Sequence, residues 1–495
     1  MSGLRLPQGG RLIDRSKPVK FHFNGRSLSG FAGDTLASAL LANGYDLLAR
    51  SFKYHRRRGL LAAGVEEPNV LVTTGPADRQ TPNQRATMVP LTSGLVAKSQ
   101  NHWPTLAFDV GAINSKLWRL FPAGFYYKTF MAPRFAWKWL YEPTIRKQAG
   151  LGKPPKSADP DTYEHIHHHT DVLIAGGGVA GLQAALTAAE SGARVMLLEQ
   201  TADFGGRAPV DGAVIAGQPV EVWIAATVAQ LRAMPHVHLR TRTTVSGLYD
   251  HGYVLANEHL SDADPKAPKE RLWRIRAKRV VVATGAIERP LMFAGNDLPG
   301  VLLASAVRDY VVNWGVAPGM RTVIVTCNDD AYRTALALAD AGQDVAAIID
   351  TRDDPQGAMP KAAREKGLRV IAGAAIAKTV GTKCVTGVIV TPYAGNGREV
   401  LEEIACDCIA VSGGWSPVVH LWSQLGGKLR WDVEMSLFRP DSMFAPTGAD
   451  GEPFVLACGA ANAHLTTGEA LTDGHTAGMT ATSNFGVMGR GKDAA

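Results

Sequence analysis

The hydrophobic pattern of residues 171–200 predicts a strand, a tight turn, a helix and a second strand. Residues 172–175 form a short apolar run typical of a buried parallel strand. A glycine-rich turn at 176–181 leads into an Ala- and Leu-rich helical stretch, and a second strand is expected over 194–198. Strand, helix and strand in this order predict the βαβ unit of an α/β fold.

The N-terminal pattern differs. Residues 18–28 alternate apolar and polar positions, as a strand followed by a tight turn does. Residues 33–44 then show a helical apolar period, with Asp34 expected as the cap and Gly44 as the end. A strand pair, a helix and a glycine-bearing loop are the order of a small β-grasp ferredoxin-like domain, which we expect over 1–102.

An aromatic-rich connector is expected over 103–165. Residues 103–141 hold 12 of the chain's 36 aromatic side chains, and the polar linker 150–161 follows. The aromatic residues can pin the connector to its neighbours, or they can form a docking surface for another subunit. An amphipathic membrane segment is the third interpretation, although no clean helical stripe is present.

The turn after the strand at 172–175 has the spacing of a dinucleotide-binding site. Gly176 permits the tight turn, Gly178 lets a pyrophosphate approach the backbone, and Gly181 lets helix and strand pack closely. Glu199 ends the second strand, where an acid can accept hydrogen bonds from both ribose hydroxyls and disfavour the 2′-phosphate of NADP. We expect this Rossmann domain over 166–318 and 416–490.

Further cofactor-binding residues are expected around the same site. The Ala283-Thr284-Gly285 turn resembles the one that closes over the cofactor in flavoproteins with two dinucleotide domains, and 454–462 resembles their last cofactor-contacting strand. There a Gly-Asp pair holds the sugar chain of the flavin, but here Ala460 follows Gly459, which favours NAD over FAD. The other residues expected at the cofactor are Val179, Ala180, Gly205, Gly206, Arg207 and Val245.

A second Rossmann-like domain is expected over 319–415. Its strand, helix and strand end in Asp350, but Thr326, Asn328 and Ala331 stand where glycines would be. Such side chains block a phosphate, and the adjacent acids at 329–330 repel it. We expect this domain to have kept the architecture and lost the ligand.

Composition narrows the functional class. The net charge is only +7, from 52 basic and 45 acidic residues, which does not indicate a nucleic-acid binder. No apolar run approaches the ~20 residues of a membrane span, the first residues lack a signal-peptide pattern, and the five cysteines show no framework spacing. The expected location is cytoplasmic, with no membrane partner.

No catalytic group or metal site stands out. The sequence has no CxxC, GxSxG or HExxH motif. Four histidines at 165 and 167–169 invite a metal hypothesis, but they directly precede a strand, where alternate side chains point to opposite sides. We therefore predict a cofactor-binding platform whose catalytic residues are unknown and which holds no metal.

Several motifs together resemble the α subunit of heterotetrameric sarcosine oxidase. They include SFKYHRRRG, EEPNVLV, RATMVPLTSGLVAKSQNHWP, GGGVAGLQAA, CNDDAYRTA and CGAANAHLTTGEAL, and the similarity runs from about residue 10 to 485. The resemblance implies an oxidoreductase acting on CH–NH groups, with NAD in this chain. It also implies β, γ and δ subunits, with FAD and FMN on β, where sarcosine or a similar secondary amine is oxidatively demethylated to glycine with formation of hydrogen peroxide.

The chain departs from that family in its length, because the family's α subunit continues into a folate-binding, aminomethyltransferase-like half. Two other hypotheses stay open: a self-sufficient FAD/NAD(P)H-dependent oxidoreductase, and a non-catalytic nucleotide-binding scaffold.

Related amine and opine oxidase systems carry a [2Fe–2S] domain in which HRxRG precedes C-x4-C-x2-C. On this sequence the three ligand positions fall on Ala62, Glu67 and Val70. None is a thiolate, so we expect a ferredoxin-like domain without a cluster. The overall prediction is an α/β chain with that domain first, followed by two interleaved Rossmann-like domains of the pyridine-nucleotide-disulfide-oxidoreductase type.

Overall fold

A computed structural model describes residues 4–121, 124, 132–260, 267–448 and 451–483. Residues 122–123 and 125–131 of the expected connector, and the expected domain end at 484–490, lie outside the described residues. The chain forms two compact units, the first from 1–160 and 288–414, the second from 161–287 and 415–495. Strands β16 (Ala286–Glu288) and β25 (Trp415–Pro417) lie where the chain passes between the units.

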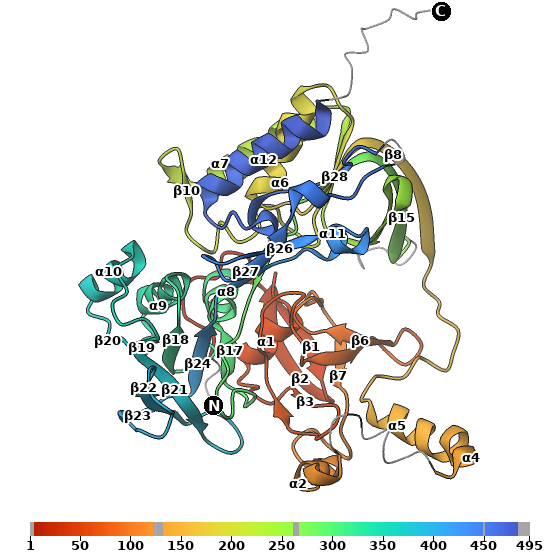
Figure 1. Ribbon diagram of the computed structural model, residues 1–495. Coiled ribbons are helices and arrows are strands. Elements are labelled where there is room, and N and C mark those ends of the chain that lie inside the picture. The colour runs from red at the N-terminus through yellow and green to blue at the C-terminus, as the bar shows by residue number, and fades with distance from the viewer. Residues whose placement is uncertain (1–3, 122–123, 125–131, 261–266, 449–450, 484–495) are drawn as a thin grey trace, which may run out of the picture. The chain divides into compact units, whose positions relative to one another are not determined.

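The first unit begins with the expected β-grasp domain, drawn in red and orange in Figure 1. Phe21 and Phe23 alternate inward from β1, and every residue of the short helix α1 is buried. The N-cap of α1 is Thr35 rather than the expected Asp34, because Thr35 forms a capping box with Ser38. The sheet order is β2-β1-β7-β5-β6. The bounds are β1 (Asp14–Phe23), β2 (Arg26–Ala32), α1 (Leu36–Ala42), β3 (Ala49–Arg50), β4 (Arg57–Arg58), β5 (Leu71–Thr74), β6 (Thr81–Arg85) and β7 (Val96–Ser99).

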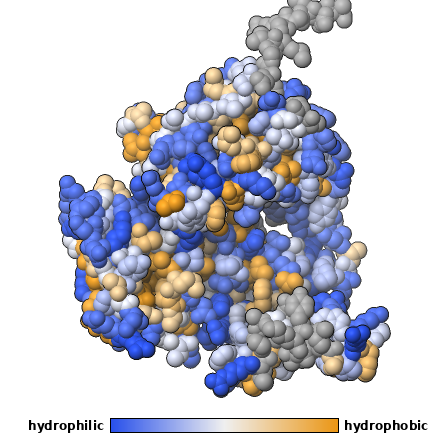
Figure 2. Space-filling model, in the orientation of Figure 1, coloured by the Kyte–Doolittle hydropathy of each residue, from blue (hydrophilic) through white to orange (hydrophobic). Residues whose placement is uncertain are grey.

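The described residues of the connector include short helical pieces, and several of their large side chains are exposed. Trp103 and Phe108 are each 70% exposed, Phe135 is 76% exposed and Trp139 is 77% exposed. In Figure 2 hydrophobic side chains reach the surface over α4. Across the described residues, no helix combines the length and apolar character needed to cross a bilayer. The bounds are η1 (Val110–Ala112), α2 (Ile113–Lys116), η2 (Trp118–Leu120), α4 (Arg134–Ala136), η3 (Trp137–Tyr141) and α5 (Glu142–Gln148).

The first unit also contains the second Rossmann-like domain, a parallel sheet of order β17-β24-β18-β19-β20. Its apolar core is continuous with that of the β-grasp domain. The expected first Rossmann domain ran to residue 318, whereas residues from 288 on belong to this unit, because α8 buries Val307 and Tyr310 in the shared core. The bounds are β17 (Val301–Leu303), α8 (Ala304–Trp314), β18 (Arg321–Thr326), α9 (Asp330–Asp340), β19 (Asp344–Asp350), α10 (Ala358–Glu365), β20 (Val370–Ile371), β21 (Ala374–Val380), β22 (Gly387–Pro392), β23 (Glu402–Ala405) and β24 (Cys408–Ser412).

The second unit is the Rossmann domain that carries the glycine-rich turn. Its sheet has the order β12-β9-β8-β15-β14-β13, and β28 pairs with β15. Strand β8 starts at Tyr163, so the four histidines lie within the strand and not before it. Val172 and Ile174 pack toward α6, α7 and α12, which Figure 1 shows together, while Leu173 and Ala175 face the other core cluster.

The remaining bounds complete this unit. The strands are β8 (Tyr163–Ala175), β9 (Val195–Leu198), β10 (Val214–Ile215), β11 (Gln218–Pro219), β12 (Val237–Arg240), β13 (Thr243–Tyr249), β14 (Tyr253–His259), β15 (Glu270–Val282), β26 (Leu429–Asp432), β27 (Leu437–Pro440) and β28 (Val455–Ala457). The helices are α6 (Val179–Glu190), α7 (Val220–Ala233), η4 (Asp250–Gly252), α11 (His420–Gln424), η5 (Ser442–Phe444), η6 (Gly459–Asn462) and α12 (Thr467–Thr482).

Candidate dinucleotide-binding site

The turn between β8 and α6 leaves no room for a side chain at two of its glycines. Gly176 has a φ of +112°, and a Cβ there would lie 2.3 Å from the carbonyl oxygen of Ala283. A Cβ on Gly181 would lie 1.9 Å from the carbonyl oxygen of Gly176. Both distances are far below ordinary van der Waals contact, so these two glycines are required by the fold of the turn itself.

Gly178 is different, because nothing in the described structure requires it to be glycine. Its φ of −68° is open to any residue, and a Cβ there would meet only the Cα of Gly206, at 4.0 Å. Gly178 is also the N-cap of α6, where no side chain caps the helix and no acid stands in the first turn. The open space therefore faces the N–H groups at the positive end of the helix dipole, an arrangement suited to a pyrophosphate.

The acid at the end of β9 is joined to this turn. Glu199 is buried, and its Oε2 accepts a hydrogen bond of 2.7 Å from the amide of Gly177. Its Oε1 accepts bonds from the amide of Thr201 at 2.8 Å and from the Thr201 hydroxyl at 2.9 Å. The carboxylate is thus fixed beside the glycines, where a ribose bound in the cradle would meet it.

The loop at 205–207 completes one side of the cradle. The amide of Gly205 donates to the carbonyl of Gly177 at 2.8 Å, and Gly178 forms a β-bridge with Gly205. The Arg207 guanidinium lies over the Trp415 ring, 5.3 Å from its centre. No local pattern predicts this stacking, since the two residues are far apart in the chain.

Two other expected segments lie against the turn. The amide of Ala283 donates to Ala175 at 2.9 Å, which places Thr284 and Gly285 beside the end of β8. Gly459 comes so close to α6 that a Cβ there would lie 2.5 Å from the Cβ of Ala180. The structure therefore gathers these expected residues around the start of α6.

Val245 stands further out. It lies in β13 opposite Ala256 and packs against the core cluster on the sheet face away from α6. Its strand reaches the site through Thr243, whose amide donates to the carbonyl of Glu199 at 2.8 Å.

Sequence reasoning missed Asp473. This residue of α12 accepts a 2.8 Å hydrogen bond from the amide of Gly459 and a 3.2 Å bond from the Asn462 side chain. A carboxylate is therefore present near Gly459, although Ala460 replaces the expected acid. Gly459 and Asn462, at the two ends of the 459–462 turn, hold this carboxylate in place. Only the tertiary packing of α12 shows this, because an acid in a helix carries no signal by itself.

The described residues of the cradle are mostly glycines and small apolar side chains, with Thr284, Arg207 and the acid Glu199 among them. Such groups bind and orient a nucleotide, and the carboxylate of Glu199 is already held by three hydrogen bonds from Gly177 and Thr201. The nearest thiol, Cys458, is fully buried, and burial raises its pKa far above the usual range. It is therefore unsuited to act as a nucleophile at neutral pH.

The equivalent turn of the second Rossmann-like domain is occupied by side chains. The Arg352 guanidinium bridges Asp329 and Asp350, with a distance of 2.7 Å to each carboxylate. The Tyr332 hydroxyl also donates to Asp350 at 2.8 Å. The acid that could bind a ribose is thus already paired, and Thr326 and Asn328 bond each other where glycines would leave space.

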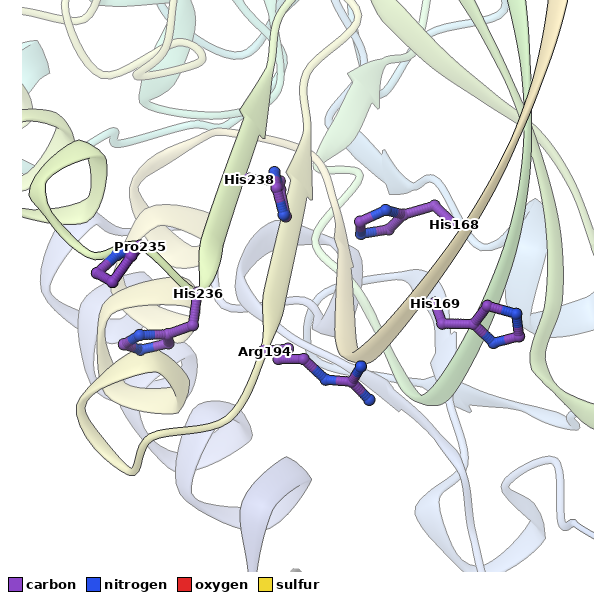
Figure 3. Close-up of a pocket in the computed structure, with 6 residues that line it drawn as sticks. All are labelled: His168, His169, Arg194, Pro235, His236 and His238. Atoms are coloured by element: carbon purple, nitrogen blue, oxygen red, sulfur yellow. The ribbon is translucent and has the colours of Figure 1, made fainter. Parts of the chain in front are cut away.

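Two of the four histidines of β8, His168 and His169, border a separate cavity of about 280 Å³, shown in Figure 3. His168 and His238 meet edge to face with ring centres 4.9 Å apart. Burial, and then His238, lowers the pKa of His168. Among the described residues, no three or more His, Cys, Asp or Glu side chains are placed to hold a metal ion. The lining residues are His168, His169, Arg194, Pro235, His236 and His238.

Residues 170–435, which contain the cradle apart from Gly459, match the family described as pyridine nucleotide-disulphide oxidoreductase. The chain belongs to this family. Residues 16–102 match a second family, the 2Fe-2S iron-sulfur cluster binding domain. The two matches correspond to the β-grasp domain and to the Rossmann architecture expected from the sequence.

Three curated relatives of this pyridine nucleotide-disulphide oxidoreductase are informative. The chain is 47% identical to the alpha subunit of sarcosine oxidase from Rhizobium meliloti (strain 1021), over 88% of its own length and 44% of the relative. It is 39% identical to the protein of the same name from Corynebacterium sp. (strain P-1), over 88% of this chain and 41% of the relative. With one of the subunits of opine oxidase from Rhizobium meliloti it shares 27% identity over 56% of each chain. The chain thus spans less than half the length of the two sarcosine oxidase relatives.

Two solved structures share the fold of this family member. L-proline dehydrogenase from P. horikoshii superposes over 98% of this chain and 76% of its own, with a TM-score of 0.65 and 22% identity. Thioredoxin reductase from T. acidophilum covers 64% of this chain and 99% of its own, with a TM-score of 0.50 and 20% identity.

The match to an iron–sulfur domain raises the question of whether this chain fits a cluster. The residues at the three ligand positions are buried, and they are Ala62, Glu67 and Val70. The first cysteine of the chain is Cys327, well beyond this domain. The domain therefore provides no thiolate for iron, and its residues do not fit a [2Fe–2S] group.

Proposed function

We propose that this chain is the NAD-binding, α-type subunit of a sarcosine-oxidase-like flavoprotein complex. The observation that carries the proposal is the cradle at Gly178, which is open, faces an uncapped helix and lies beside the fixed carboxylate of Glu199. The 47% identity to a sarcosine oxidase α subunit supports the proposed type of activity.

The nucleotide is NAD and not NADP, because the fixed acid Glu199 would repel a 2′-phosphate. It is NAD and not FAD, because Ala460 lacks the carboxylate that would reach a flavin sugar chain. The acid that does lie near, Asp473 of α12, already accepts hydrogen bonds from Gly459 and Asn462. The filled turn of the second Rossmann-like domain supports one dinucleotide per chain.

The amine oxidation takes place on a partner β subunit, which carries FAD and FMN. The cradle residues of this chain are suited to bind and orient a nucleotide, and this agrees with such a division. The substrate is sarcosine or a similar secondary amine, which is demethylated to glycine with formation of hydrogen peroxide. Partners of the β, γ and δ types complete the complex.

The connector supports assembly with another subunit. Trp103, Phe108, Phe135 and Trp139 leave more than two thirds of their surface exposed, so they do not pin the connector to the rest of the chain. Large aromatic side chains at a surface are typical of protein–protein contacts. We assign the surface formed by these four side chains to the docking of a partner subunit.

One experiment tests the proposal directly. The chain is purified alone, its bound nucleotide is released by denaturation, and the nucleotide is identified by mass spectrometry. NAD at about one equivalent without flavin is the expected result. Stoichiometric FAD would contradict it and favour a self-sufficient FAD/NAD(P)H-dependent oxidoreductase. NAD that is never accompanied by amine-dependent oxygen uptake, even after co-expression with flavin-bearing partners, would favour a non-catalytic scaffold.

A further inference from the structure

The loop that would surround an iron–sulfur cluster is folded around one carboxylate. Glu67 is 1% exposed, and its two oxygens accept four backbone hydrogen bonds. Oε2 accepts from the amides of Leu61 and Ala62, each at 2.8 Å. Oε1 accepts from the amides of Asn69 at 2.7 Å and Val70 at 3.2 Å. Donors from both ends of the loop thus converge on a single anion.

This convergence has the form of an anion-binding nest. Consecutive backbone N–H groups that point inward create a concave positive site, and many iron–sulfur sites use this device toward the sulfur atoms. In this chain Glu67 itself occupies the second of the three ligand positions and supplies the anion. The other two positions, Ala62 and Val70, are fully buried in the apolar core.

The charge balance is consistent with this role. A buried carboxylate without partners is costly, so burial raises the pKa of Glu67, while the four backbone donors oppose that rise. A side chain that only filled space at this position would leave these four backbone amides without an acceptor. The loop requires acceptor oxygens at its centre, and both oxygens of Glu67 supply them.

The same loop also contacts the second Rossmann-like domain within the first unit. The Tyr310 hydroxyl of α8 donates to the carbonyl of Ala62 at 3.0 Å, and the amide of Leu303 donates to the carbonyl of Leu61 at 2.8 Å. Tyr310 is fully buried. The two residues whose amides bind Oε2 of Glu67 are therefore the residues whose carbonyls hold both ends of the segment 303–310.

We propose that Glu67 replaces the iron–sulfur cluster as the anion around which the loop 60–70 folds. The β-grasp domain then acts as a structural element that fixes β17 and α8, and not as an electron carrier. This inference does not depend on which nucleotide the Rossmann domain binds or on which amine is oxidised.

The test compares Glu67→Gln with Glu66→Gln in the full-length chain. Glutamine keeps the size of Glu67 but replaces one acceptor oxygen with a donor that faces two amides. Glu66 is the adjacent acid and is only half-buried, so it is a matched control. Hydrogen exchange measured by mass spectrometry should speed up at least tenfold in peptides that cover 59–72 and 303–314 in Glu67→Gln. Exchange in the peptide that covers 172–190 should not change, and Glu66→Gln should match the parent.

Equal exchange in the two variants would overturn the proposal, because a space-filling role is kept by glutamine. Should Glu67→Gln fail to fold, Glu67→Asp is the second variant, since a shorter acid keeps the charge but cannot reach both pairs of amides. Faster exchange in Glu67→Asp, or failure of both variants beside a folded Glu66→Gln, supports the role of Glu67. Iron and acid-labile sulfide in the anaerobically purified parent protein should be far below one cluster per chain. A stoichiometric cluster would overturn the replacement.

Discussion

Glu199 and Gly177 are joined by a hydrogen bond of 2.7 Å, from the amide of the glycine to Oε2 of the acid. The bond ties the end of β9 to the turn before α6, so the proposed ribose-binding acid and the proposed pyrophosphate-binding turn are directly connected. A hydrogen bond that fixes the acid beside the turn lowers the ordering cost of binding.

Substitution of Gly178 should separate nucleotide binding from folding. Gly178→Val places a branched side chain in the open cradle, where a pyrophosphate would lie, while its φ of −68° imposes no backbone strain. We expect at least a hundredfold weaker NAD binding with an unchanged thermal unfolding midpoint, measured by isothermal titration calorimetry and differential scanning fluorimetry. Gly181→Ala is the contrast, because its Cβ would overlap the carbonyl of Gly176 and should lower the unfolding midpoint. Undiminished NAD binding in Gly178→Val would refute the site.

Glu199→Gln should weaken NAD binding and relax cofactor choice. The variant replaces one acceptor oxygen with a donor that faces the amide of either Gly177 or Thr201, at a cost of about 1–3 kcal/mol. It also removes the charge that would repel a 2′-phosphate. We expect NAD affinity to fall about tenfold or more and the NAD/NADP affinity ratio to fall further, both by calorimetry. The exposed Asp203→Asn is the control, and an unchanged ratio would argue against contact of Glu199 with ribose.

The five thiols should divide into two groups under alkylation at pH 8. Cys327 and Cys384 are partly exposed, whereas the other three are buried. Burial raises the pKa of Cys406 and of Cys408 to about 12, so roughly one molecule in ten thousand carries the thiolate at pH 8. Peptide mass spectrometry of the native protein should find label on Cys327 and Cys384 only, and on all five after denaturation. Early labelling of Cys408 would show that the sheet around β24 opens readily.

Glu288 should make the stability of the protein depend on pH. It is buried, and burial raises its pKa from 4.5 to about 7. A raised pKa means that the folded state favours the neutral acid. This stabilising contribution is complete below pH 4.5 and is lost as the pH rises through 7, a change of roughly 3 kcal/mol. Glu288→Gln should therefore raise the thermal unfolding midpoint at pH 8 and have much less effect at pH 5.

The control for Glu288 is the exposed Glu221→Gln, which should behave like the parent at both pH values. A gain in midpoint that is the same at pH 5 and pH 8 would mean that the ionisation of Glu288 is not its cause.

The local geometry of the Rossmann site was predictable, because each element carries its own signal. The apolar run before Gly176, the spacing of the glycines and the acid at Glu199 encode a strand, a turn and a second strand within 30 residues. Such short-range patterns depend on backbone conformation and on packing between neighbouring elements, and consecutive residues of the sequence determine both.

The rest could not be predicted from the sequence, because it depends on contacts between distant segments. Asp473 joins Gly459 only when α12 is in place, and Arg207 meets Trp415 across some 200 residues of chain. The boundary after Ile287 depends on Tyr310. In the sequence Tyr310 is an ordinary apolar position of a helix, and only the structure shows that its hydroxyl donates a hydrogen bond to the β-grasp loop. In the sequence Glu67 marks only a position where a cluster ligand is missing. The structure shows that its carboxylate accepts hydrogen bonds from four backbone amides.

The order of strands has a consequence for synthesis on the ribosome. Strand β24 lies between β17 and β18, although about 100 residues separate it from β17, and β28 joins β15 only after the whole first unit has been made. Neither sheet can be completed until its late strand, β24 or β28, has left the ribosomal exit tunnel. Nascent chains that stop before Val455 will therefore expose the edge of β15 and the uncovered side of α6. Such partial translation products should be recruited by chaperones or cleared by proteases, and they should not accumulate as a half-functional nucleotide-binding fragment.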